Sequence, residues 1–174
     1  MKYAAFLRGI NLGKRQIKMA ELKSVLEGLG FDEVKTILAS GNVVFTSSTG
    51  KSDQLKNGIE TAIKKRFGFD VHVLLRTEKE IATLVKNDPF KNIKVTPQTR
   101  LYITFLSEPP KSKLKAPHKD GDFTLHEITK SHLVSILGPK VSSPDVMDFL
   151  GEEFGKEITT RNWNTILRIA KAME

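Results

Sequence analysis

The sequence predicts an α+β protein with two tandem subdomains, at residues 1–77 and 78–174. In the first 77 residues, hydrophobic patterns with strand and helix periods follow one another in the order β-α-β-β-α-β. This order is typical of a ferredoxin-like domain, and it accounts for all of this part of the chain. The remaining residues contain a second mixed set of strands and helices. We therefore expect two ferredoxin-like (βαββαβ-type) subdomains that pack together.

Strand-like and helix-like hydrophobic patterns mark the elements of the first subdomain. Each helix has an apolar stripe at intervals of three and four residues, and each is expected to end at a glycine, Gly30 or Gly68. Ser52 is the expected N-cap of the second helix, and Ser40-Gly41 is the expected tight turn between the two middle strands. The strands are predicted at 2–9, 32–40, 42–48 and 70–77, and the helices at 18–31 and 52–68.

The second subdomain is less regular. A loop rich in proline and lysine separates a strong strand from a hairpin that is expected to turn near Thr129-Lys130. Ser143 is the expected N-cap of the next helix, with Pro144 in its first position. Strands are predicted at 99–107 and 156–161, a hairpin at 123–137, helices at 78–87, 143–155 and 162–174, and the loop at 108–122.

The first strand is apolar on both faces. Tyr3, Ala5 and Leu7 alternate with Ala4 and Phe6, and the last strand of the first subdomain has the same character. An antiparallel sheet with one face in water should instead alternate between apolar and polar residues. We therefore expect one face to be covered by the helices and the other by the second subdomain or a partner chain.

Composition excludes several classes of site. The chain has no cysteine, so disulfides, thiolate zinc sites and cysteine nucleophiles are excluded. Its four histidines lack metal-binding spacing, and no metal or cofactor is predicted. No signal sequence or membrane-spanning stretch is recognised, which favours a cytoplasmic protein. The net charge is +8, of which +6 lies in residues 1–77, so this half is the one expected to attract anions.

Three polar clusters stand out: "LRGINLG" near the start, "SGNVVF" about thirty residues later, and "TTRNWNT" before the last helix. In their order and spacing these motifs resemble the domain of unknown function 1697 family, over nearly the whole chain. The resemblance implies a bacterial-type protein with two tandem ferredoxin-like subdomains. It implies no established activity.

The first two clusters match no catalytic or nucleotide-binding motif. Gly9 and Gly13 are one residue too close for a phosphate-binding loop, and Arg15 stands where that loop needs a hydroxyl residue. A plain glycine turn and a looser anion-binding loop both stay open here. Ser40 has no adjacent base, which favours a structural hairpin turn. Whether the protein is an enzyme is not predicted.

The third cluster combines a structural anchor with an unexplained arginine. Trp163 is the only tryptophan, and it shares an apolar helical stripe with Leu167 among others, so we expect a core position. Asn162 or Thr160 is expected to cap this helix. A cation at a helix N-terminus is unfavourable, so Arg161 needs either an acidic neighbour or an anionic ligand.

The leading hypothesis is that the protein binds a small anionic or polar ligand in a cleft between the subdomains. A nucleic-acid-binding module is the less favoured alternative, because the first half is basic but its third strand offers only Phe45 for base stacking. A protein-interaction module that forms homo-oligomers is a further alternative. The candidate ligand-binding residues are Arg8, Gly9, Asn11, Ser40, Gly41, Asn42, Arg161, Asn162 and Asn164.

Overall fold

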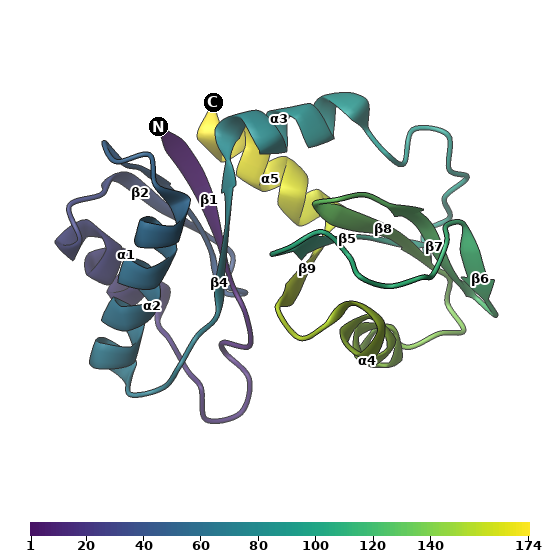
Figure 1. The fold of residues 1–174 in the computed structure, drawn as a ribbon, viewed down its shortest axis with the longest axis horizontal. Helices are drawn as coiled ribbons and strands as arrows, with labels where there is room; N and C mark the ends of the chain where they lie inside the picture. The colour runs from purple at the N-terminus through teal and green to yellow at the C-terminus, as the bar shows by residue number, and fades with distance from the viewer. The chain divides into compact units, whose positions relative to one another are not determined.

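The computed structural model describes residues 1–174 as a mixed α+β protein with two antiparallel sheets and five helices (Figure 1). The chain forms two compact units. Unit 1 comprises residues 1–86 and 167–174, and unit 2 comprises residues 87–166. This division differs from the expected one at residue 77, because the third helix and the end of the last helix both belong to unit 1.

Unit 1 follows the element order expected from the sequence. Its sheet has the spatial order β2-β3-β1-β4, with every neighbouring pair antiparallel. Helix α3 follows β4 without a loop. The elements are β1 (Lys2–Leu7), α1 (Met19–Gly28), β2 (Asp32–Ile37), β3 (Asn42–Thr46), α2 (Ser52–Phe67), β4 (Val73–Thr77) and α3 (Glu78–Asn87).

Helices α1 and α2 contact each other and cover one face of this sheet (Figure 1). The buried residues of that face, such as Tyr3 and Phe45, pack with Leu26 of α1 and Ile59 of α2. Residues of the opposite face are buried too, as the two-sided apolar pattern of the strands predicts; they include Ala4, Phe6, Val44 and Leu74.

The ends of α2 illustrate which local signals are reliable. Gly68 adopts the left-handed conformation, with φ 83°, and ends the helix as expected. The predicted cap at Ser52 is wrong, because Ser52 already lies within the helix and Lys51 occupies the capping position without a side-chain hydrogen bond. A hydroxyl one residue inside the helix no longer reaches the free N–H groups of the first turn.

Unit 2 has a five-stranded sheet in the order β6-β7-β8-β5-β9. Without β6, the sheet has four strands. When the strands of each unit are numbered in chain order, these four have the same spatial order as the four strands of unit 1. No helix connects β5 to β7, however, so unit 2 lacks the first helix of a complete βαββαβ pattern. The elements are β5 (Arg100–Leu106), β6 (His118–Asp120), β7 (Phe123–Ile128), β8 (His132–Leu137), α4 (Ser143–Phe154), β9 (Ile158–Asn162) and α5 (Trp163–Met173).

Two local features of unit 2 differ from the expectation. Strand β6 lies within the segment that was expected to be a loop, and pairs with β7 through the two-residue turn Gly121-Asp122. The Asp-Gly-Asp run is itself a hairpin signal. The cap of α4 is Ser142, whose Oγ accepts a hydrogen bond from the N–H of Asp145 at 3.2 Å, and the predicted cap Ser143 lies one position later.

Helix α4 covers one face of the unit 2 sheet. Val146 and Leu150 of this helix pack against Leu106, Leu125 and Leu133 of the strands. Helix α5 begins in unit 2 and continues into unit 1. No helix of the structure combines the length and the apolar character that a membrane crossing requires.

Candidate anion-binding site

Three connections of unit 1 lie at the same end of its sheet. In the pairing register, Phe6 lies opposite Asn42 and Leu7 lies opposite Val73. The segment after β1, the turn between β2 and β3, and the segment before β4 therefore meet where β1 ends. We call these residues 8–18, 38–41 and 68–72 the first, second and third loops. The candidate residues Arg8 to Asn11 and Ser40 to Asn42 all belong to this end of the sheet.

Asn11 joins the first loop to the second. Its Nδ2 donates to the carbonyl oxygen of Ala39 at 2.6 Å, and its Oδ1 accepts a hydrogen bond from the N–H of Ile17 at 2.8 Å. The Asn11 backbone has a φ of 56°, a left-handed conformation that asparagine tolerates better than most residues. The side chain is thus already used to fix the path of the first loop.

The second loop is held by Asn42, which is fully buried. Its Nδ2 donates to the carbonyl oxygen of Ile37 and to Oγ of Ser40, both at 2.9 Å. Gly41, which lies between Ser40 and Asn42 in the sequence, has a φ of 82°. Its carbonyl oxygen accepts a hydrogen bond from the N–H of Leu7 at 2.8 Å. These contacts make the Ser40–Asn42 turn a device that anchors the second loop to the end of β1.

The third loop is attached through Arg8 and Arg15. The N–H of Arg8 donates to the carbonyl oxygen of His72 at 2.9 Å. The Arg15 side chain donates to the carbonyl oxygen of Asp70, and its guanidinium lies 5.1 Å from the centre of the Phe69 ring. Arg15 therefore clamps the first loop to the third.

The Arg8 side chain differs from Arg15 in having no internal partner. It is half-buried, and its guanidinium makes no hydrogen bond or ion pair within the chain. The first loop that follows contains three left-handed residues, Gly9, Asn11 and Gly13. The N–H groups of Gly9, Ile10 and Gly13 donate to no other backbone group. Gly9 and Ile10 thus place two successive N–H groups beside an arginine, an arrangement that suits an anion.

A Glu–His pair that joins α2 to the last residue of the third loop was not predicted from the sequence. Glu60 Oε1 lies 3.4 Å from His72 Nδ1 and accepts a hydrogen bond from the N–H of Val73 at 2.8 Å. Both residues line a polar pocket of about 450 Å³, together with Lys64 and Asp70 among others. The two residues come from α2 and from the segment before β4, and no spacing in the sequence indicates that they meet.

In unit 2, Arg161 lies on β9 opposite Ile103. Its Nη1 donates to Oγ1 of Thr159 at 2.8 Å and to the carbonyl oxygen of Thr160 at 2.9 Å. Burial disfavours the charged form and lowers the pKa of Arg161 to about 10. The side chain is thus a desolvated cation that hydrogen-bonds to its own strand.

The residues after Arg161 start helix α5. Asn162 Oδ1 accepts a hydrogen bond from the N–H of Asn164 at 2.9 Å, so that Asn162 is the capping residue of the two that were predicted, Asn162 and Thr160. Trp163 is buried, with its ring in an edge-to-face contact 5.3 Å from Phe90. Leu167, which was expected on the same apolar stripe, is instead partly exposed. The side chain of Asn164 is exposed.

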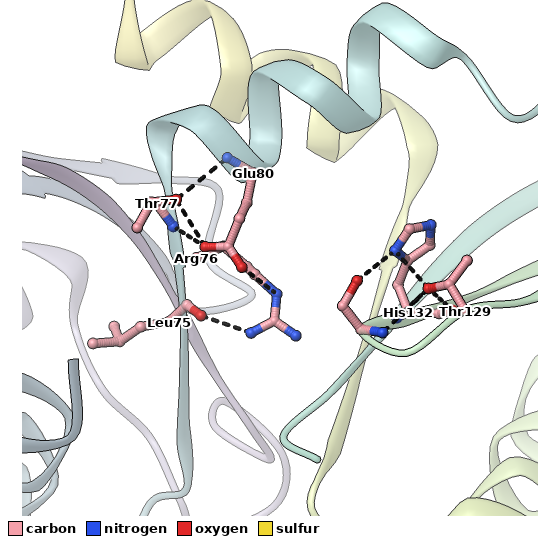
Figure 2. A network of polar contacts seen from close by, with 7 residues as sticks. Leu75, Arg76, Thr77, Glu80, Thr129 and His132 are labelled. Atoms are coloured by element: carbon pink, nitrogen blue, oxygen red, sulfur yellow. Dashed lines mark hydrogen bonds and ion pairs between the residues drawn. The ribbon is translucent and has the colours of Figure 1, made fainter. Parts of the chain in front are cut away.

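Figure 2 shows further polar contacts within each unit. In unit 1, Thr77 and Glu80 form a reciprocal cap at the start of α3, and Arg76 Nε lies 3.8 Å from Glu80 Oε1. In unit 2, His132 Nδ1 lies 3.1 Å from Thr129 Oγ1 in the predicted hairpin turn. No group of three or more histidine, aspartate or glutamate residues is arranged to hold a metal ion.

Comparisons with known proteins identify the family. A solved structure of a conserved bacterial protein from Streptococcus pneumoniae is similar over 99% of this chain and 98% of its own, with a TM-score of 0.71 and 23% sequence identity. That likeness concerns the fold. No curated protein matches. The model of the family described as "Protein of unknown function (DUF1697)" matches residues 1–132, a range that includes the first two polar motifs and ends before the third, so the chain belongs to this family.

Proposed function

We propose that the protein binds a small anionic ligand at the first loop of unit 1. The observation that carries this proposal is Arg8, a half-buried residue whose guanidinium has no partner within the chain. A cation that is partly withdrawn from water is more stable when a carboxylate or phosphate accepts its hydrogen bonds. The free N–H groups of Gly9 and Ile10 add neutral donors beside it.

Local charge supports an anion over a cation. Residues 8–18 contain Arg8, Lys14, Arg15 and Lys18 and no acidic residue. The nearest acidic residue of the third loop, Asp70, has its carboxylate 3.0 Å from Lys64 Nζ. The ligand class we propose is therefore a small metabolite that carries a phosphate or carboxylate group, which two hydrogen bonds from one guanidinium recognise well.

The other candidate residues differ in whether their side chains already make hydrogen bonds within the chain. Asn11 and Asn42 use their amides to shape the loops, so their proposed role is to position Arg8 and the free N–H groups. Arg161 and Asn164 of unit 2 are proposed as a second set of ligand contacts, on the strength of the sequence motif alone. We also propose that unit 1 is ferredoxin-like and that unit 2 is a related unit in which residues 107–117 replace a helix; the shared strand order supports both.

Nucleic-acid binding is the alternative that the same loops allow, because they are basic. The aromatic residue that could have stacked on bases, Phe45, is fully buried and stacks on Tyr3 and Phe31 in the core of unit 1. A base-stacking surface on this sheet is therefore not supported. Charge attraction by the basic loops is the contribution to nucleic-acid binding that unit 1 still allows.

Isothermal titration calorimetry with inorganic phosphate, citrate and a mononucleotide tests the proposal. We expect at least one of them to bind saturably, and Arg8→Gln to weaken binding by about 1.5–3 kcal/mol, which is typical of a charge-assisted hydrogen bond. Lys65→Gln, at an exposed position of α2, is the matched control and should change little. Equal affinity of Arg8→Gln and wild type would rule out this site. Binding only to a long RNA, with a steep dependence on salt, would favour the alternative.

A further inference from the structure

Two exposed leucines stand at the tips of the first and second loops. Leu12 is 68% exposed and Leu38 is 46% exposed. The loops that carry them are joined directly by the hydrogen bond from Asn11 to Ala39, whose two residues are the chain neighbours of Leu12 and Leu38. The two apolar side chains therefore belong to one surface at one end of unit 1.

The backbone at Leu38 is held in an unfavourable conformation. Its φ is 60°, in the left-handed region that residues with a Cβ atom seldom adopt. No turn glycine or asparagine stands there to relieve this, although Gly41 follows three residues later. Conformations of this kind are maintained where the surrounding structure imposes them, and they cluster at functional sites. Here the result is a leucine presented to solvent.

The first loop carries three exposed basic residues. Lys14, Arg15 and Lys18 follow Leu12 in the first loop and are exposed. The acidic residues of β2 lie elsewhere: Asp32 pairs with Thr46, at the opposite end of the sheet from the loops. The surface thus combines exposed leucines with the positive charges of Lys14, Arg15 and Lys18. Asp70 of the third loop is a carboxylate at the same end of the sheet, and it pairs with Lys64.

We propose that this surface docks onto an anionic lipid bilayer, with Leu12 and Leu38 entering the boundary between headgroups and acyl chains. Lys14 and Lys18 would then contact anionic headgroups, in the combination of apolar and basic contacts that stabilises peripheral membrane binding. The leucines favour lipid over nucleic acid, because bases stack on aromatic rings and neither loop tip exposes one. The proposal uses the same loops as the proposed anion site but different side chains, and it rests on that site only for the positive charge.

The absence of cysteine makes a direct insertion test clean. Leu12→Cys and Leu38→Cys would each introduce one thiol, which is labelled with an environment-sensitive nitrobenzoxadiazole dye. With vesicles of phosphatidylcholine containing about one-third phosphatidylglycerol, we expect a blue shift and a rise in emission at both positions. Phosphatidylcholine vesicles alone should give neither. Val95→Cys, at an apolar residue of unit 2 that is 54% exposed, is the control and should report no change.

Vesicle co-sedimentation separates this proposal from general charge attraction. Leu12→Ser combined with Leu38→Ser should reduce the partition coefficient on the anionic vesicles by at least about tenfold. Lys14→Gln with Lys18→Gln should reduce it and weaken its salt dependence, whereas Val95→Ser and Lys56→Gln should leave it unchanged. Full binding by the serine variant, or equal binding by Val95→Ser and that variant, would overturn the proposal.

The outcomes also separate this proposal from the anion site. Arg8→Gln that loses phosphate binding but still binds vesicles would leave the docking surface intact. Capture of polyglutamate or RNA with no vesicle binding would overturn the lipid proposal, since it would show that the basic loops act on a polyanion in solution.

Discussion

Gly41 of the second loop lies close to Ile10 of the first loop and to Leu7 of β1. A Cβ atom built there would lie 2.7 Å from Ile10 Cδ1 and 2.9 Å from Leu7 Cβ, well inside van der Waals contact. Leu7 Cβ is part of a buried strand and has no freedom to move away. Gly13 in the first loop has a similar backbone, with φ 55° against 82°, but its surroundings are open. Substitutions at the two glycines therefore separate two effects on stability: that of the left-handed backbone conformation and that of a Cβ atom placed too close to neighbouring side chains.

We expect Gly41→Ala to lower the free energy of unfolding by about 2–5 kcal/mol. Gly13→Ala should lower it by only about 1–2 kcal/mol, because that variant is affected by the left-handed backbone alone. Urea denaturation followed by circular dichroism measures both. If the two variants were equally stable, the close contact between the loops would not contribute.

At the scale of elements, the junction between β4 and α3 is specified by a reciprocal set of side-chain hydrogen bonds. Thr77 Oγ1 accepts a hydrogen bond from the N–H of Glu80 at 3.3 Å, while Glu80 Oε2 accepts hydrogen bonds from the N–H and the hydroxyl of Thr77, both at 2.8 Å. This is a capping box with the sequence T-x-x-E. It lets a strand become a helix with no intervening loop.

Removing the hydroxyl of this cap should destabilise unit 1. We expect Thr77→Ala to lower the free energy of unfolding by about 1 kcal/mol and Thr77→Ser to retain most of it, because serine caps helices as well as threonine does. Thr61→Ala, at an exposed position of α2, should stay within about 0.5 kcal/mol of wild type. Urea denaturation of the four proteins makes the comparison, and an alanine variant as stable as the serine variant would contradict the capping role.

On the scale of the whole molecule, unit 1 contains both ends of the chain, and unit 2 is formed by the residues between them. Residues 167–174 belong to unit 1, where the carbonyl oxygen of Met173 accepts a hydrogen bond from Lys2 Nζ at 3.1 Å. Met173 is buried and lines a small pocket of about 250 Å³ with Ile81 and Val85 of α3. The last turn of α5 is therefore part of the structure that the first residues of the chain begin.

Because residues 167–174 belong to unit 1, we predict that the C-terminal end of α5 stabilises this unit. Met173→Ala should lower the free energy of unfolding by about 2–4 kcal/mol, since it leaves a cavity beside α3. Leu167→Ala in the same helix should cost less than about 1 kcal/mol, because Leu167 is partly exposed. Hydrogen exchange of α3 amides should increase in the Met173 variant alone. Unchanged exchange there would show that α3 is stable without the C-terminal helix.

Whether both arginines act on one ligand is a second question for the whole molecule. The sequence hypothesis predicts that Arg8 and Arg161 contact the same small anion. A double-mutant cycle with Arg8→Gln and Arg161→Gln, measured by calorimetry with the anion that binds best, should then show a coupling energy of about 0.5–3 kcal/mol. Strictly additive effects, or an Arg161→Gln variant that binds as well as wild type, would restrict the site to unit 1.

Local patterns in the sequence were sufficient to predict the elements of unit 1, the hairpin turn at Thr129-Lys130, and the capping role of Asn162. These features depend on hydrophobic periods and on side-chain bonds that reach only two or three residues along the chain. The caps expected at Ser52 and Ser143 were wrong by one position. Ser142 and Ser143 offer the same hydroxyl group, whereas at α2 the capping position is occupied by Lys51, which makes no side-chain hydrogen bond there. Strand β6 was missed, although its Asp-Gly-Asp turn was a readable signal.

Only the tertiary structure decided which side chains lie together at one end of unit 1. The contacts that join Asn11 to Ala39, Arg15 to Asp70 and Glu60 to His72 link residues far apart in the sequence, and strand register determines which of them meet. The tertiary structure also decides which side chains have no partner within the chain. Arg15 and Arg8 are both arginines of one loop, but the fold gives Arg15 a carbonyl and an aromatic ring and gives Arg8 neither. Long-range packing thus determines which cation is structural and which is available to a ligand.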